Sequence, residues 1–325
     1  LVIGILFGAA GSGAYTLTIL GFAAATLAYS MLGGLTASLR TDVFQMLLLL
    51  GALGMLLALV AATGAVETAD LWAVPFVPSD PGPVLMAVAL LQVWSYPLHD
   101  PVMMDRGFLA DRRTTRRSFL HAAWISILCI LAFGAVGVLG GAHAGAGESM
   151  NDALLRLLGG HTMLVFNAAL VVSAMSTLDS TLSSSAKLVA VDMGVVRASL
   201  RNGRLVMAAF MLLGLALVFW GSEDLFAAVA VSGTASLYLA PVVFFSLWGG
   251  RRDIPVWSHV GAFGLAMAGA ALYFIESAGH TAWLGDAHKY TKLLGISGSV
   301  LAGGCLLYWA GGALERTRRR APRAA

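Results

Sequence analysis

The amino-acid sequence predicts an all-α protein that crosses a membrane many times. Only 11% of its 325 residues are charged and 58% are hydrophobic, whereas a soluble domain carries about 25% charged residues. The hydrophobic residues form long unbroken runs, and a helix needs about 20 such residues to cross the bilayer. A membrane-spanning β-barrel would show short segments of alternating hydrophobicity instead. This pattern excludes a soluble enzyme and a soluble binding domain.

Nine runs are long enough to be spans, and residues 1–10 have the composition of the end of an earlier one. We expect residue 1 to lie inside a longer protein, because the sequence begins within an apolar run. The nine predicted spans are residues 14–33, 41–63, 84–105, 118–140, 161–190, 205–221, 225–248, 257–277 and 290–311.

Positive charge alternates between the connections of these spans. Most of the 20 lysines and arginines lie in every second connection and in the C-terminal tail. The positive-inside rule places such connections in the cytoplasm, so we expect a multi-pass protein of the inner cell membrane with a cytoplasmic C-terminus. The same rule explains the arginine-rich residues 112–117 and 316–323 without nucleic acid as a partner. We expect membrane lipids beside them.

The span at residues 161–190 carries polar side chains at a density that is costly in hydrocarbon. At 100° per residue, they fall within an arc of about 160° on one face of the helix. One interpretation is that the hydroxyls bond to neighbouring helices and to carbonyls one turn back. The other is a lining of oxygen ligands for a monovalent cation, since hard cations prefer oxygen. This polar stripe comprises Ser173, Ser176, Thr177, Asp179, Ser180, Ser183, Ser184 and Lys187.

A second polar group opens the span at residues 41–63, where Thr41 and Asp42 follow Arg40. Thr41 can cap the helix, and a carboxylate in the first turn suits the helix dipole. Capping alone explains both residues. However, Asp42 is predicted at the cytoplasmic end of its span, and the polar stripe descends to the same side. A shared ion site is therefore the alternative interpretation.

The span at residues 84–105 contains Pro97 and Pro101, each of which removes a backbone donor and clashes with the preceding turn. We expect this helix to be kinked or unwound about two-thirds of the way along. Broken helices at bilayer depth line cavities, and in transporters they hold the substrate. A plain proline kink, with Trp94 and Tyr96 packed in the core, is the alternative.

Four segments of the chain have the order and spacing of motifs in a known family. They are Gly33–Gln45, His99–Leu109, Ala174–Met193 and Ala240–Arg252. In these segments the chain resembles the sodium:solute symporter family, which includes symporters of proline, sialic acid, sugars and vitamins. The resemblance extends over nearly the whole chain, and the Ser176–Thr177 and Thr41–Asp42 motifs are the most specific to the family.

The resemblance implies the leucine-transporter-like fold, in which two inverted five-helix repeats form the bundle. Residues 1–325 would then be a single transmembrane transporter domain that lacks its first core helices. Core helices four to ten would lie at residues 14–248, and additional helices at residues 257–311.

The resemblance also implies two sodium sites. In the first, the hydroxyls of Ser176 and Thr177 and the carbonyl of Ser173 would bind Na⁺ between the eighth and first core helices. In the second, an acid on core helix five and groups on core helix eight would bind Na⁺. The residues at the positions of the second site are Asp42, Ser176, Asp179 and Ser180. Asp179 replaces what is often a hydroxyl, which leaves the charge and stoichiometry of that site open.

The broken helix would contribute to the solute site. Tyr96 matches an aromatic gate of the family, with Trp94 beside it, whereas His99 and Asp100 depart from the small or amide residues that are common there. This departure leaves the class of solute open. A metal site formed by His99, Asp100 and Asp105 is a weaker hypothesis, because no second His or Cys lies nearby to complete the ligand set.

These expectations converge on Na⁺-coupled symport of a small polar solute by alternating access. No nucleophile–base pair or metal-ligand set is visible in the spans, so we expect no enzyme activity and no cofactor besides Na⁺ as the coupling ion. Two alternatives remain. The module could serve as the membrane sensor of a signalling protein, or symport could be coupled to protons through Asp42, Asp179 and His99.

Overall fold

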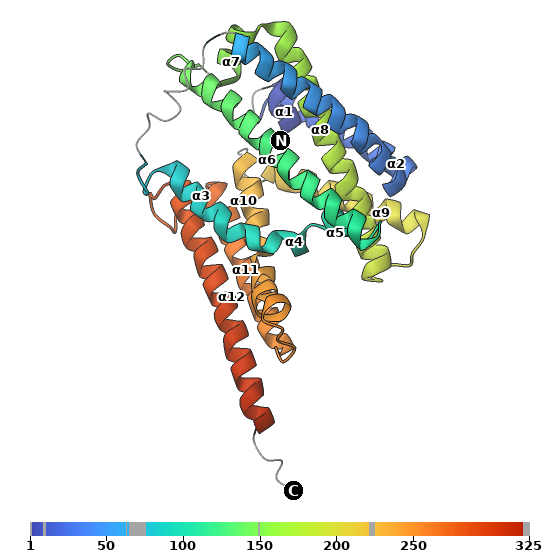
Figure 1. The fold of residues 1–325 in the computed structure, drawn as a ribbon, viewed down its shortest axis with the longest axis vertical. Coiled ribbons are helices and arrows are strands. Elements are labelled where there is room, and N and C mark those ends of the chain that lie inside the picture. Colours follow the sequence, from blue (N-terminus) through green and yellow to red (C-terminus); the bar gives the residue numbers. More distant parts are fainter. Residues whose placement is uncertain are drawn as a thin grey trace. The chain divides into compact units, whose positions relative to one another are not determined.

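A computed structural model describes residues 2–8, 11–62, 64, 76–148, 150–220 and 225–320. Most of these residues are helical, and there is no strand among them (Figure 1). The ends of two predicted spans, at residues 63 and 221, lie outside the described part, as do residues 1, 9 and 10 of the predicted remnant and residues 321–325 of the tail. The helices form two compact units, Leu1–Pro75 with Pro101–Leu213 and Phe76–Asp100 with Gly214–Ala325.

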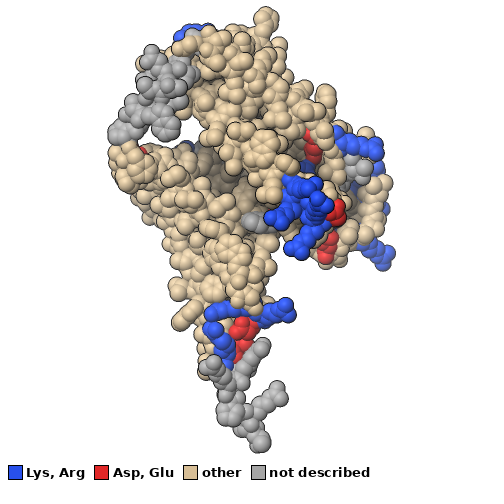
Figure 2. All heavy atoms as spheres, viewed as in Figure 1, with Lys and Arg blue, Asp and Glu red and all other residues tan. Residues whose placement is uncertain are grey.

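The described helices confirm that the chain is a multi-pass membrane protein. Eight of them are long and apolar enough to cross a bilayer. Figure 2 shows a surface on which charged side chains gather in a few places and most of the area is uncharged. Of the nine predicted spans, the one at residues 84–105 forms no long helix, and its apolar part is the shorter segment Pro81–Ser95.

In the first unit, α8 is the element against which most of the others pack. It contacts α2, and also α1, α5 and α7, while α6 contacts α2 and α7. A small apolar core between these helices contains Leu56, Val136, Leu154 and Phe166. The helices are α1 (Val2–Phe7), α2 (Gly13–Ala62), α5 (Pro101–Gly107), α6 (Arg112–Ala142), α7 (Met150–Leu158), α8 (Gly160–Lys187) with the π-helical extension η2 (Leu188–Asp192), and α9 (Leu200–Trp220), which runs into the second unit.

The helix α2 covers two candidate spans, Gly13–Gly33 and Ser38–Ala62. Its two parts cannot be collinear. The hydroxyls of Tyr29 and Thr41 lie 2.9 Å apart, although twelve residues of straight helix extend about 18 Å. We infer that α2 changes direction between these two residues, in agreement with the separate spans predicted at 14–33 and 41–63. The change of direction brings side chains from both parts of α2 to α8.

The second unit is built around two helices that pack along each other, α11 (Val256–Ser277) and α12 (Lys289–Arg320) (Figure 1). The core contains Leu237, Ala266, Tyr273 and Leu293. The remaining elements are α3 (Pro81–Gln92), the 3₁₀-helix η1 (Val93–Ser95), α4 (Tyr96–His99), α10 (Leu225–Ser236), the 3₁₀-helix η3 (Leu237–Leu239) and the π-helix η4 (Val242–Trp248).

The predicted break in the span at 84–105 is confirmed. The α-helix gives way to η1 and the single turn α4, and Asp100 then has an extended backbone with φ −92° and ψ 106°. Pro101 disfavours the helical conformation in the residue before it, which explains the break at Asp100. Pro97 lies in the first turn of α4, where its missing N–H group leaves no helical hydrogen bond unmade. The two pieces on either side of the break belong to different units.

Close packing of α11 and α12 generates a prediction about glycine. A Cβ atom at Gly269 would lie 2.6 Å from Cγ2 of Val300 and 3.2 Å from Cγ2 of Ile296. Gly269→Ala should therefore lower the free energy of unfolding by about 1–3 kcal/mol through overpacking, measured as a lower thermal midpoint in detergent. Gly264→Ala, on the same helix with nothing within 4 Å, is the control. Equal midpoints for both variants would contradict the packing described.

Candidate ion-binding site

The polar stripe of α8 faces a carboxylate on α2. The Ser176 hydroxyl donates a hydrogen bond to Oδ1 of Asp42, and the Ser180 hydroxyl lies 3.3 Å from Oδ2 of the same group. Ser38, also on α2, is buried and places its hydroxyl 3.0 Å from that of Ser180. The structure thus brings together Asp42, Ser176 and Ser180, as the sequence predicted for a shared site.

Arg106 supplies a cation to this group. Its guanidinium donates to Oδ2 of Asp42 and lies 3.3 Å from the Ser180 hydroxyl. From the sequence, Arg106 is expected only as part of the positive-inside pattern, and its contact with Asp42 was not predicted. A signal was present, since Arg106 follows the broken helix on the membrane side predicted for Asp42.

A neighbouring ion pair holds α5, and with it Arg106, against α8. Lys187 donates to Oδ1 of Asp105 at 2.6 Å and to Oδ2 of Asp192 at 3.1 Å. The side chain of Asp105 is 11% exposed, while that of Lys187 is 40% exposed. Lys187 is therefore a structural partner for carboxylates on two other segments, in addition to being a member of the polar stripe.

Asp179 lies deeper in the same interface. It is 2% exposed and interacts with the hydroxyls of Ser30 and Ser38 on α2, and with the charge of Asp42. Its Oδ1 atom has no hydrogen-bond partner in the described part of the chain. No lysine or arginine among the described residues forms an ion pair with it. Asp179 is thus a buried carboxyl group surrounded by neutral hydroxyls and one like charge.

Further buried oxygens on α2 and α8 lack a partner within the described chain. They are the hydroxyls of Ser183 and Ser184 on α8 and of Thr26 on α2, all 4% exposed or less. Buried polar atoms are normally hydrogen bonded, and oxygens left over in a polar interface are suited to water or a hard cation. Both helices therefore carry buried oxygens that are not used in hydrogen bonds within the described chain.

A surface pocket approaches this interface. It has a volume of about 450 Å³ and is bordered by Ser30, Lys187 and Arg204, among other residues. Arg204 donates to the carbonyl of Met31 at 3.0 Å, which fixes one wall. Ser30 borders the pocket and also interacts with Asp179, and its hydroxyl donates to the carbonyl of Thr26 at 2.8 Å.

The other predicted sodium ligands do not join the group. Thr177 is exposed, and its hydroxyl donates to the carbonyl of Ser173 at 3.1 Å. Consecutive residues on a helix point about 100° apart, so Ser176 turns towards Asp42 and Thr177 turns away. Thr181 likewise bonds to the carbonyl of Thr177 at 2.7 Å. The hydroxyls of these two threonines therefore bond to carbonyls of their own helix and do not contact Asp42 in the described chain.

The predicted gate residues belong to the second unit. Trp94 packs edge-on against Phe244 and Trp248, each with a ring-centroid distance of 5.5 Å. The rings of Tyr96 and His99 are 4.6 Å apart, and Tyr96 is 48% exposed. Trp94 makes these ring contacts but is itself 40% exposed, so neither Trp94 nor Tyr96 is packed in the core as the plain-kink interpretation expected.

Asp100 forms the extended link between α4 and α5. It does not form a metal site with His99 and Asp105, because the described residues contain no group of three or more His, Cys, Asp or Glu side chains that could hold a metal ion.

The second unit also contains a buried polar network that the sequence analysis missed. The amide of Gln92 donates to the hydroxyls of Thr234 and Ser297, both at 3.2 Å. One turn on, the hydroxyls of Ser95 and Ser236 lie 2.9 Å apart. A glutamine in an apolar run was the signal available. Each of these groups has a partner, so the network joins α3, α10 and α12 in the manner of interhelical hydrogen bonds in membranes.

Comparison with known proteins adds no assignment: no protein-family model, no curated protein and no solved structure matches the chain. The chemistry of the site therefore follows from its geometry. Of the two carboxylates, Asp42 is paired with Arg106, whereas Asp179 has no ion-pair partner among the described residues and interacts with hydroxyls. Such a group is suited to one further monovalent cation.

Proposed function

We propose that this chain forms most of a Na⁺-coupled symporter for a small polar solute, located in the inner cell membrane with its C-terminus in the cytoplasm. The proposal includes the leucine-transporter-like architecture that the sequence resemblance implies, and no enzyme activity. The observation that carries it is the charge balance between α2 and α8. Burying an ionised carboxylate without a partner is unfavourable by several kcal/mol. An ionised Asp179 therefore requires a compensating cation beside it.

The ligand types favour Na⁺ as that cation. All the available groups are oxygens of carboxylates and hydroxyls, which bind hard cations rather than transition metals. Asp42, Asp179 and Arg106 together carry a net charge of one carboxylate, and a monovalent ion neutralises this charge whereas Ca²⁺ would leave an excess positive charge. In this proposal Asp42, Ser176, Ser180 and Asp179 are the sodium ligands, and Ser38 supports them.

A bound ion would link α2 to α8 and so favour one arrangement of these helices over another. A ligand shifts a conformational equilibrium only by its differential affinity for the two states. If solute binding depends on the same arrangement, then the ion and the solute are coupled reciprocally. The broken helix with Tyr96 and His99 is the proposed solute-facing element, because interrupted helices hold the substrate in many transporters.

A proton is the second candidate for the coupling ion, and the burial of Asp179 favours it specifically. Protonation of this carboxyl group would remove the unmatched charge without any metal ligand. Sodium would instead need the hydroxyls of Ser176 and Ser180 as well. The two coupling ions therefore predict different residues to be essential.

Substitution at the two helices separates these candidates. For Na⁺ coupling, we expect Asp179→Asn to weaken Na⁺ binding about tenfold or more, and Ser176→Ala to weaken it several-fold, because each removes one ligand. Binding of radioactive sodium to the purified full-length protein measures both. Thr181→Ala, whose hydroxyl bonds to its own helix, is the matched control and should bind Na⁺ normally. If Ser176→Ala behaves as the control does, while Asp179→Asn abolishes the pH dependence of uptake, the coupling ion is a proton and the sodium proposal fails.

Arg106 provides an independent prediction. Arg106→Gln removes the resident cation and leaves both carboxylates unmatched, so half-saturation by Na⁺ should fall to a several-fold lower concentration. The thermal midpoint in Na⁺-free buffer should also fall and should recover as Na⁺ is added. Arg40→Gln, which removes an exposed arginine near the same part of α2, serves as the control. A Na⁺ response that is identical in the two variants would contradict competition between Arg106 and the ion.

A further inference from the structure

The first turns of α6 hold an unusual concentration of positive charge. Arginine occupies four of its first six positions, as Arg112, Arg113, Arg116 and Arg117. The positive end of the helix dipole disfavours cations there. The first N–H groups of the helix are already bonded, since Asp111 accepts from the backbone N–H groups of residues 113 and 114. The positive-inside rule explains the number of these arginines but not their arrangement.

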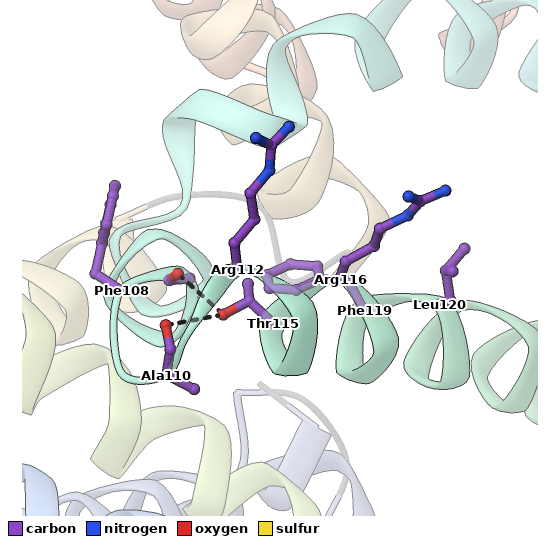
Figure 3. Close-up of a pocket in the computed structure, with 8 residues that line it drawn as sticks. Phe108, Ala110, Arg112, Thr115, Arg116, Phe119 and Leu120 are labelled. Atoms are coloured by element: carbon purple, nitrogen blue, oxygen red, sulfur yellow. Dashed lines mark hydrogen bonds between the residues drawn. The ribbon is translucent and has the colours of Figure 1, made fainter.

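Two of the arginines border an open pocket with a volume of about 790 Å³. Arg112 and Arg116 are one helical turn apart and extend to the same side of α6 (Figure 3). Phe108, Phe119 and Leu120 supply apolar walls. The pocket therefore combines two guanidinium groups with an apolar lining.

The turn that shapes this pocket is fixed by its own hydrogen bonds. The hydroxyl of Thr115 lies 3.3 Å from the carbonyl of Ala110 and 3.4 Å from that of Gly107 (Figure 3). Thr115 thus holds the end of α5 against the start of α6 and is not needed for a ligand. This leaves the guanidinium groups of Arg112 and Arg116 as the polar groups that face outward.

Two carboxylates that are close to this pocket in the sequence are engaged elsewhere. Asp105 pairs with Lys187, and Asp111 accepts hydrogen bonds from the start of α6. Within the described part of the chain, no carboxylate forms an ion pair with Arg112 or Arg116. The pocket accordingly has an excess of two positive charges.

We propose that this pocket binds an anionic phospholipid. The fork of N–H groups on each guanidinium matches phosphate oxygens in a bidentate manner, and Arg112 and Arg116 would hold the phosphate of the headgroup together. The acyl chain would follow Phe119 and Leu120 along α6, which are 40% and 58% exposed. These apolar walls and the membrane-spanning length of α6 favour a lipid over a free phosphate ion.

The test compares two double variants of the full-length protein that carry the same net charge. R112Q/R116Q removes the pocket arginines. R113Q/R117Q removes the two arginines that lie about 100° around the helix and do not border the pocket. Binding of phosphatidylglycerol, with phosphatidylcholine of the same acyl chains as the reference lipid, is measured by native mass spectrometry after detergent release.

We expect R112Q/R116Q to lose about tenfold in phosphatidylglycerol binding, whereas R113Q/R117Q should change little. Phosphatidylcholine should bind weakly to all proteins. Equal losses in the two variants would show a diffuse electrostatic attraction and overturn the site. Competition by millimolar inorganic phosphate would identify a phosphate-ion site and overturn the lipid assignment. R112K/R116K keeps the charge without the fork, so undiminished lipid binding by this variant would overturn the bidentate geometry.

Discussion

The interface between α2 and α8 contains two carboxylates, of which Asp42 is paired with a described cation and Asp179 is not. In a low-dielectric interior each unmatched charge is unfavourable by several kcal/mol, and the surrounding structure is arranged around this requirement. The change of direction in α2 lets Ser30 and Ser38 both reach Asp179. The ion pair of Lys187 with Asp105 holds α5 where Arg106 can reach Asp42.

The sequence predicted the half of this site that depends on helical periodicity. Spacing of 100° per residue places Ser176 and Ser180 on one face of α8, and the structure turns both towards Asp42. The same geometry turns Thr177 away, which the motif alone did not reveal. Arg106 was missed for a different reason. It lies 64 residues from Asp42, and no local pattern specifies a contact that arises only when separate helices pack.

The fold shows the same division between local and tertiary information. Apolar length predicted the membrane-spanning helices, and proline chemistry predicted the interruption before Pro101, because both are properties of a short stretch of chain. The network around Gln92 depends on partners from distant helices. The close approach of α11 and α12 at Gly269 is also tertiary, although a small residue at a helix contact is a recognisable signal.

The unequal surroundings of the two carboxylates assign them different tasks. Asp42 keeps a guanidinium partner and is 18% exposed at its side chain, so its charge is compensated in any state that preserves the Arg106 contact. Among the described residues, Asp179 interacts with hydroxyls and with the like charge of Asp42, so in the proposed mechanism its charge is compensated by the ion or proton that enters the interface. Ser30 interacts with Asp179 and also borders the adjoining pocket, so one residue links this carboxyl group to a surface pocket. In the proposed mechanism, the coupling ion would therefore bind at Asp179, and the neighbouring charges of Asp42 and Arg106 would determine how strongly it is attracted.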